Sequence, residues 1–177
     1  MLYQAFFNRC IVDLRRIVFL STLVLLNGCL EVRSQGQSRI SSQPCSHDHK
    51  GSCHVIEMLN YSKGFTHVFS PGFLKIKPGD KIIFQSLNHG HNVMSVSIPE
   101  GAKRWESNLS HSFSLVLKIP GVYFYKCEPH DSAGMIGVIQ VGDSLNNYSH
   151  AVKEAESMNI LENRFRIHEY FSQLGER

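Results

Sequence analysis

The sequence lacks a hydrophobic run long enough to cross a membrane, and it lacks a strong net charge. Its longest apolar run covers residues 17–26 and includes Ser21 and Thr22, whereas a transmembrane helix needs about 20 apolar residues. The formal net charge is only +3, and without residues 1–28 the count is 15 basic against 14 acidic residues. Such a nearly neutral chain is not typical of a protein that binds nucleic acid.

The chain also lacks the length of a large multidomain enzyme and the low hydrophobicity of a disordered protein. Its 177 residues suit one domain with processing or linker segments at the ends. With 42% hydrophobic and 10% aromatic residues, the chain can bury a core. We therefore expect one folded domain.

Residues 1–28 have the features of a signal peptide, because Arg15 and Arg16 precede the apolar run and small or polar residues follow it. The sequence Leu26-Asn27-Gly28-Cys29 resembles a bacterial lipobox, in which Cys29 would be lipidated and become the mature N-terminus. The alternative is ordinary secretory cleavage a few residues later. Either interpretation places the mature protein outside the cytoplasm, and we expect it in the periplasm, anchored to the membrane if Cys29 carries lipid.

Residues 29–53 are predicted to be a solvated tether, because they are rich in Ser, Gln, Gly and His and show no hydrophobic period. The tether contains Cys45 and Cys53, with His47 and His49 between them. In an oxidising compartment the two cysteines would close a small disulfide loop. The alternative is a soft-metal site built from thiolate and imidazole.

Residues 54–142 alternate apolar and polar side chains with period two, and turn residues interrupt the pattern. Leu74 and Ile76 alternate with lysines before the turn at 78–80, and a second alternating run covers 113–119. No helical period separates these runs. The pattern therefore predicts an all-β fold, an antiparallel β-sandwich of several short strands.

Residues 143–177 change to spacings of three and four, which predicts two short helices lying as a lid on the sandwich. Asp143 and Ser144 offer oxygens for an N-cap. His150 and His168 fall on these helices and are predicted to be surface or packing residues.

A loop between the last two predicted strands carries three side chains with metal-binding atoms. Cys127, His130 and Met135 supply a thiolate, an imidazole and a thioether within nine residues, so one turn can direct all three at a common centre. A fourth donor must come from another part of the chain. His91 is the best candidate, and His89 competes with it.

Two imidazoles and one thiolate in a trigonal arrangement, with a weak axial thioether, form the donor set of a blue-copper electron-transfer site. Zinc fits less well, because a thioether adds little to zinc affinity and a catalytic zinc needs an open position for water. The sequence therefore predicts one copper ion cycling between Cu(I) and Cu(II). Four protein ligands leave no vacant position for a substrate, so we expect an electron carrier rather than an enzyme.

Several further motifs resemble those of the pseudoazurins, a family of cupredoxins. They are Phe69-Ser70-Pro71, Lys77-Pro78-Gly79-Asp80, Gly90-His91-Asn92-Val93, Ile98-Pro99-Glu100-Gly101-Ala102, Pro120-Gly121-Val122-Tyr123, Lys126-Cys127-Glu128-Pro129-His130 and Gly134-Met135-Ile136-Gly137. The resemblance implies an eight-stranded Greek-key β-sandwich with two C-terminal helices. It also implies copper bound by His91, Cys127, His130 and Met135, and a role as a periplasmic electron shuttle.

The resemblance further implies that the backbone amide of Asn92 hydrogen-bonds to the Cys127 sulfur and tunes the reduction potential. We expect electrons to pass through the edge of His130, which Pro129 flanks. The expected partners are redox proteins such as a c-type cytochrome or a copper reductase. We expect the protein itself to be a monomer.

The resemblance implies docking through a ring of lysines, as is usual for pseudoazurins, whereas here Glu128 and Asp131 lie in the ligand loop. Lys126, Lys103 and Arg104 are the cations available for a positive patch. The ligand loop of this chain therefore carries acidic residues where the resemblance implies a lysine-rich docking surface.

Two other functions remain open at this point. A copper enzyme would use the His89-Gly90-His91 and His47-Asp48-His49 pairs for a second centre. A copper-binding chaperone would load or buffer metal through the Cys45–His54 cluster.

Overall fold

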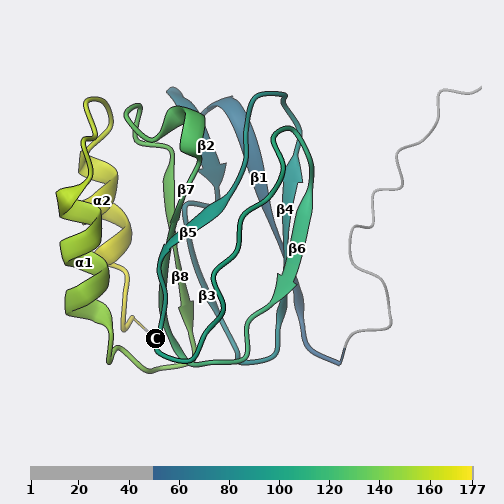
Figure 1. Cartoon of the computed structure of the whole chain (residues 1–177), viewed down its shortest axis with the longest axis vertical. Helices are drawn as coiled ribbons and strands as arrows, with labels where there is room; N and C mark the ends of the chain where they lie inside the picture. Colours follow the sequence, from purple (N-terminus) through teal and green to yellow (C-terminus); the bar gives the residue numbers. More distant parts are fainter. Residues whose placement is uncertain (1–49, 177) are drawn as a thin grey trace, which may run out of the picture. The chain divides into compact units, whose positions relative to one another are not determined.

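A computed structural model describes residues 50–176 of the chain. Two sheets of four strands each form a sandwich (Figure 1), with strand orders β2-β1-β4-β6 and β3-β8-β7-β5. The strands are β1 (Cys53–Ser62), β2 (Phe65–Ser70), β3 (Phe73–Ile76), β4 (Lys81–Ser86), β5 (Met94–Ser97), β6 (Phe113–Val116), β7 (Gly121–Lys126) and β8 (Ile136–Val141). The predicted all-β sandwich is confirmed.

The expectation of purely antiparallel pairing is wrong at two places. β1 runs parallel to β4, and β3 runs parallel to β8. After β2 the chain leaves the first sheet, forms β3 in the second sheet and returns as β4, so β4 enters beside β1 in the same direction. No helix is needed for this crossover, because the connecting chain passes through the opposite sheet. The remaining strand pairs are antiparallel.

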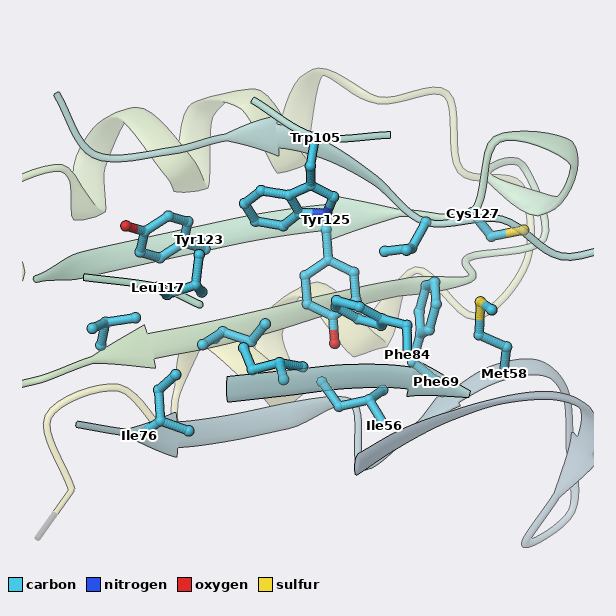
Figure 2. Packing of buried hydrophobic residues seen from close by; sticks show 14 of the residues in the cluster. Ile56, Met58, Phe69, Ile76, Phe84, Trp105, Leu117, Tyr123, Tyr125 and Cys127 are labelled. Carbon is cyan, nitrogen blue, oxygen red and sulfur yellow. The ribbon is translucent and has the colours of Figure 1, made fainter. Parts of the chain in front are cut away.

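An aromatic cluster fills the space between the sheets near one end of the sandwich (Figure 2). Phe69, Phe84 and Tyr125 meet edge to face, with ring centroids 4.9 to 6.1 Å apart. Such ring pairs contribute about 0.5–1.5 kcal/mol each beyond the area that they bury. Cys127 lies in the same buried cluster, so the core packs directly against the thiol.

Tyr125 is completely buried, and its hydroxyl has no hydrogen-bond partner among residues 50–176. Burial, with the nearby Tyr170, raises the pKa of this phenol well above its usual value. A tyrosine that loses an electron must also lose its proton, and this hydroxyl has no hydrogen-bonded acceptor in the described part of the chain. Tyr125 therefore serves packing rather than electron relay.

Helices α1 (Tyr148–Ser157) and α2 (Phe165–Phe171) cover the outer face of the sheet that contains β7 and β8 (Figure 1). Ala151 and Ala155 of α1 and Ile167 and Phe171 of α2 are buried against this sheet. The predicted two-helix lid is thus confirmed. Neither helix is long and apolar enough to span a membrane, within the described residues. His150 and His168 are exposed, as expected.

The predicted N-cap of the first helix is wrong. The residue before α1 is Asn147, and its side chain makes no capping hydrogen bond to the helix. The Asn147 side chain instead accepts the Val122 N–H at 2.9 Å and donates to the Val122 carbonyl at 2.7 Å, which ties the helix start to β7. Asp143 pairs with Lys75 at 3.1 Å. Docking to the sheet has therefore replaced local capping.

The proposed signal peptide, the lipidation site Cys29 and Cys45 lie outside the described residues. Cys53, the first residue of β1, is disulfide-bonded. Its pairing with Cys45 and the domain boundaries at 28, 53 and 142 remain predictions.

Asp80 anchors the turn between β3 and β4 and should contribute measurably to stability. Its side chain accepts hydrogen bonds from the backbone N–H groups of Lys77 and Ser52, both at 2.9 Å, and from His54 Nε2 at 3.1 Å. Burial raises the pKa of this carboxyl, but these hydrogen bonds and the nearby His54 outweigh burial and hold the pKa below 3.8. The stabilisation is therefore present above pH 3.8 and is lost as the pH falls through the lower, folded-state value.

We expect Asp80→Asn to lower the free energy of unfolding at pH 7 by about 1–3 kcal/mol, because at least one backbone donor loses a charged acceptor. Urea denaturation at several pH values measures this loss, which should shrink in acid. Asp143→Asn is the control, since the Asp143 side chain is 94% exposed. Equal losses for both variants would contradict the assignment.

Candidate metal centre

The loop after β7 is folded by its own backbone so that its three candidate ligands stay together. The Cys127 N–H donates to the Met135 carbonyl at 2.9 Å, and the Met135 N–H donates to the His130 carbonyl at 3.1 Å. Residues Glu128–His130 form a short 3-10 helix, η1, in which Pro129 occupies the first turn. Backbone hydrogen bonds thus hold the positions of Cys127, His130 and Met135.

His91 comes from the connection between β4 and β5 and lies beside this loop. The Cys127 Sγ atom is 3.8 Å from His91 Nδ1 and 3.4 Å from His130 Nδ1. His91, Cys127 and Met135 are all completely buried. His89 is exposed, so His91 is the imidazole that the structure brings to the sulfur.

Asn60 of β1 orients the His91 ring, a role that the sequence did not reveal. The His91 Nε2 atom lies 2.8 Å from Asn60 Oδ1. Since an amide oxygen only accepts, Nε2 carries the proton, and Nδ1 faces Cys127 with a free lone pair. Hydrogen bonds of this kind are typical supports of metal-binding histidines.

Asn92 connects the His91 segment to the ligand loop. Its Oδ1 atom accepts the Glu128 N–H at 2.8 Å. Its backbone N–H lowers the pKa of the Cys127 thiol, and the hydrogen bond from this N–H to the sulfur that the family resemblance implied stays a prediction. Asn92 therefore ties the His91 segment to the ligand loop at the residue next to Cys127.

The surroundings of Cys127 disfavour a thiolate unless a cation lies beside it. Burial is the largest influence and raises the pKa of the thiol; the backbone N–H groups of Asn92 and His130 act against burial, while Asp131 and Glu128 add to the rise. The thiolate thus needs a positive partner beside it, as a metal ion would supply. The donor set of two imidazoles, one thiol and one thioether suits copper.

The imidazoles of the centre are neutral at pH 7. Burial, followed by the proximity of His130 and His67, lowers the pKa of His91 to about 4. Burial and then His67 also lower the pKa of His130. Both rings can therefore offer a lone pair to a metal without first releasing a proton.

His67 of β2 is a third imidazole at the centre, and it was not predicted. Its ring is stacked on His130, with centroids 4.0 Å apart and planes at 12°. Nitrogen atoms of His67, His91 and His130 lie within 4.8 Å of one another. The Nδ1 atom of His67 is buried and has no hydrogen-bond partner in the described part of the chain.

Among the candidate ligands, only His130 reaches the surface. His130 is partly exposed and follows the exposed Glu128 and Pro129. The other three candidate ligands are completely buried: His91, Cys127 and Met135. Lys126 does not add free positive charge here, because its ammonium group pairs with Asp131 at 2.7 Å. The expected positive patch therefore lacks Lys126.

Comparison with known proteins gives a consistent result. Residues 56–142 match the family of copper-binding proteins of the plastocyanin/azurin type. A pseudoazurin of Paracoccus pantotrophus is 38% identical over 96 residues, which span 53% of this chain and 66% of the relative. A putative pseudoazurin of Rhizobium leguminosarum bv. viciae is 38% identical over 113 residues, which span 63% of this chain and 74% of the relative.

Solved structures agree with these sequence relatives. The pseudoazurin crystal structure from Methylobacterium extorquens AM1 superimposes with a TM-score of 0.64 at 31% identity, covering 69% of this chain and 98% of that one. The sandwich with two C-terminal helices is thus the pseudoazurin fold. The chain belongs to the pseudoazurins within the plastocyanin/azurin family, and it is a blue copper electron carrier rather than an enzyme.

Proposed function

We propose that His91, Cys127, His130 and Met135 hold one copper ion, and that the protein carries single electrons between redox partners outside the cytoplasm. The observation that carries this proposal is the convergence of Cys127 Sγ with His91 Nδ1 and His130 Nδ1, at 3.8 and 3.4 Å, on one buried centre. Bound copper supplies one-electron chemistry by alternating between Cu(I) and Cu(II).

The residues around the centre keep its geometry constant while the charge changes. Backbone hydrogen bonds fix Cys127 and Met135, and Asn60 fixes the His91 ring. The amide donors of Asn92 and His130 stabilise negative charge on the sulfur. Because these supports belong to the folded chain, little rearrangement should accompany electron transfer.

The edge of His130 is the proposed exit for the electron. Leu109 and Leu87 are about half exposed, at 51% and 48%, on loops that adjoin the His91 segment. The Ser110 N–H donates to the His91 carbonyl at 2.7 Å, which places Leu109 next to this segment. A redox protein, such as a c-type cytochrome or a copper reductase, could bury these apolar side chains while it approaches His130.

Copper titration of the purified protein tests the proposal. We expect one copper per chain, an intense visible band and a blue-copper electron paramagnetic resonance spectrum. A colourless copper-bound protein, or a stoichiometry of two with oxidase or nitrite reductase activity, would contradict it.

We also propose that the protein resides in the periplasm, with residues 29–53 as a tether and Cys29 as the lipid attachment site. The support is the sequence pattern of residues 1–29. Mass spectrometry of the mature protein measures both the cleavage position and any lipid. An unlipidated N-terminus beyond Cys29 would show ordinary secretion instead.

The rival function, a copper chaperone, makes a different prediction for the tether. Replacing residues 30–52 by a Gly/Ser linker of equal length should leave copper occupancy and the visible spectrum unchanged, because the proposed ligands all lie within 91–135. Copper content and absorption measure this outcome. A loss of copper occupancy after the replacement would support the chaperone, in which the Cys45–His54 cluster loads the metal.

A further inference from the structure

Arg166 of α2 is a buried cation beside the metal centre. Its side chain is among the largest that are fully buried, and the residue is only 2% exposed. A buried guanidinium is costly unless its N–H groups find acceptors. No ion pair in the described part of the chain includes Arg166, so carbonyl groups must compensate the charge.

Three backbone carbonyls accept from this guanidinium, and they belong to two segments that build the centre. Nη1 donates to the Gly134 carbonyl at 2.7 Å and to the His67 carbonyl at 2.9 Å, and Nη2 donates to the Thr66 carbonyl at 3.2 Å. The Cζ atom also lies 5.6 Å from the centroid of the Phe65 ring. The planar, fork-shaped group thus joins β2 to the ligand loop.

One of these hydrogen bonds supports an unusual backbone conformation. His67 has φ +50°, in the left-handed region, although it lies within β2. This conformation is unfavourable for a residue with a side chain and persists where neighbouring groups enforce it. Arg166 holds the His67 carbonyl in place, and the ring of His67 lies stacked on His130.

The hydrogen bond from Arg166 to the Gly134 carbonyl acts on the ligand loop. The carbonyl of Gly134 belongs to the peptide group that joins Gly134 to Met135, and Gly134 also has a left-handed φ of +74°. Holding this peptide fixes the direction in which the chain enters Met135. Arg166 therefore contacts the backbone of β2 at His67 and the backbone of the ligand loop at Gly134, next to the proposed ligand Met135.

We propose that Arg166 is a positioning residue of the copper centre, which sets Met135 through the 134–135 peptide and sets the His67 ring against His130. This inference rests on the proposed function. The positive charge has a second effect: reduction adds one negative charge to the centre, so a nearby buried cation stabilises the reduced form.

The test compares Arg166→Met and Arg166→Lys with Arg164→Met in the copper-loaded full chain. Arg164 is a matched control, because it is the N-cap residue of α2 and its guanidinium also donates to carbonyls, those of Met158 and Glu156, which lie outside the ligand loop. Redox titration followed by absorption measures the potential, and electron paramagnetic resonance measures the symmetry of the centre.

We expect Arg166→Met to lower the reduced-to-oxidised ratio, at the wild-type midpoint potential, by about threefold or more, because the buried charge is gone. Arg166→Lys keeps the charge but cannot match the planar fork, so it should change the potential less while still altering the spectra. Arg164→Met should leave both properties unchanged.

Failure of this inference is distinguishable from failure of the proposed function. Wild-type protein without the blue band overturns the proposed function and this inference with it. A blue wild-type protein whose Arg166 variants keep its potential and spectra, even at a lower melting temperature, overturns only the positioning role. If Arg166→Met does not fold by circular dichroism, the spectra of Arg166→Lys alone decide between the two results.

Discussion

Cys127→Ser should abolish the intense visible band of the copper-loaded protein. The band arises from charge transfer between thiolate and copper, and a serine oxygen is a harder donor that does not suit Cu(I). The sulfur is completely buried and lies 3.8 Å from His91 Nδ1 and 3.4 Å from His130 Nδ1. No other free cysteine lies within residues 50–176. Absorption spectra at equal protein concentration, together with copper analysis, measure the loss.

Tyr125→Phe is the matched control for this experiment. Tyr125 lies two positions before Cys127 in the same core cluster and is equally buried. Because its hydroxyl has no hydrogen-bond partner among the described residues, its removal should leave the band intact and cost no stability, with a gain of up to about 1 kcal/mol. A serine variant that keeps the band would exclude Cys127 as the sulfur ligand.

Met135→Leu should raise the reduction potential by about 60 mV or more while copper stays bound. An axial thioether is a weak ligand that tunes the potential rather than holding the ion. A change of 59 mV corresponds to about tenfold in a one-electron equilibrium. Leucine nearly conserves the volume of methionine, so the completely buried site should lose less than about 1.5 kcal/mol of stability. Redox titration of the blue band measures the shift.

Met58→Leu provides the comparison for the axial ligand. Met58 of β1 is also completely buried and belongs to the same core cluster as Met135 and Cys127. Met58→Leu should change the reduction potential by only a small fraction of the change that Met135→Leu causes. If the Met58 variant changes the potential and the Met135 variant does not, the axial assignment is wrong.

The C-terminal region does more than cover the sheet, because it also forms hydrogen bonds with the ligand loop. Arg166 reaches from α2 to the backbone of the ligand loop, and the Leu161 N–H donates to the Ser132 carbonyl at 2.8 Å in the same loop. Asn163 also donates to the Ala133 carbonyl at 3.0 Å. Helix α2 and the connection between α1 and α2 thus supply part of the framework that holds residues 132–134.

Secondary structure followed from the sequence because the period of apolar residues reports which face of each element is buried. The alternation around Leu74 and Ile76 and the three-to-four spacing after Gly142 predicted strands and helices correctly. Strand partners did not follow, because pairing depends on which sheet the chain enters after each turn. The parallel neighbours β1 and β4 arise from such a change of sheet.

The sequence by itself determined the chemistry of the centre, because Cys127, His130 and Met135 share one short loop whose spacing limits where their donor atoms can lie. Only the tertiary structure decided which distant groups join them. It placed His91 rather than His89 beside the sulfur, and brought in Asn60 and Arg166. These contacts join residues 31 to 36 positions apart, so they depend on how sheets and helices pack and leave no local pattern in the chain.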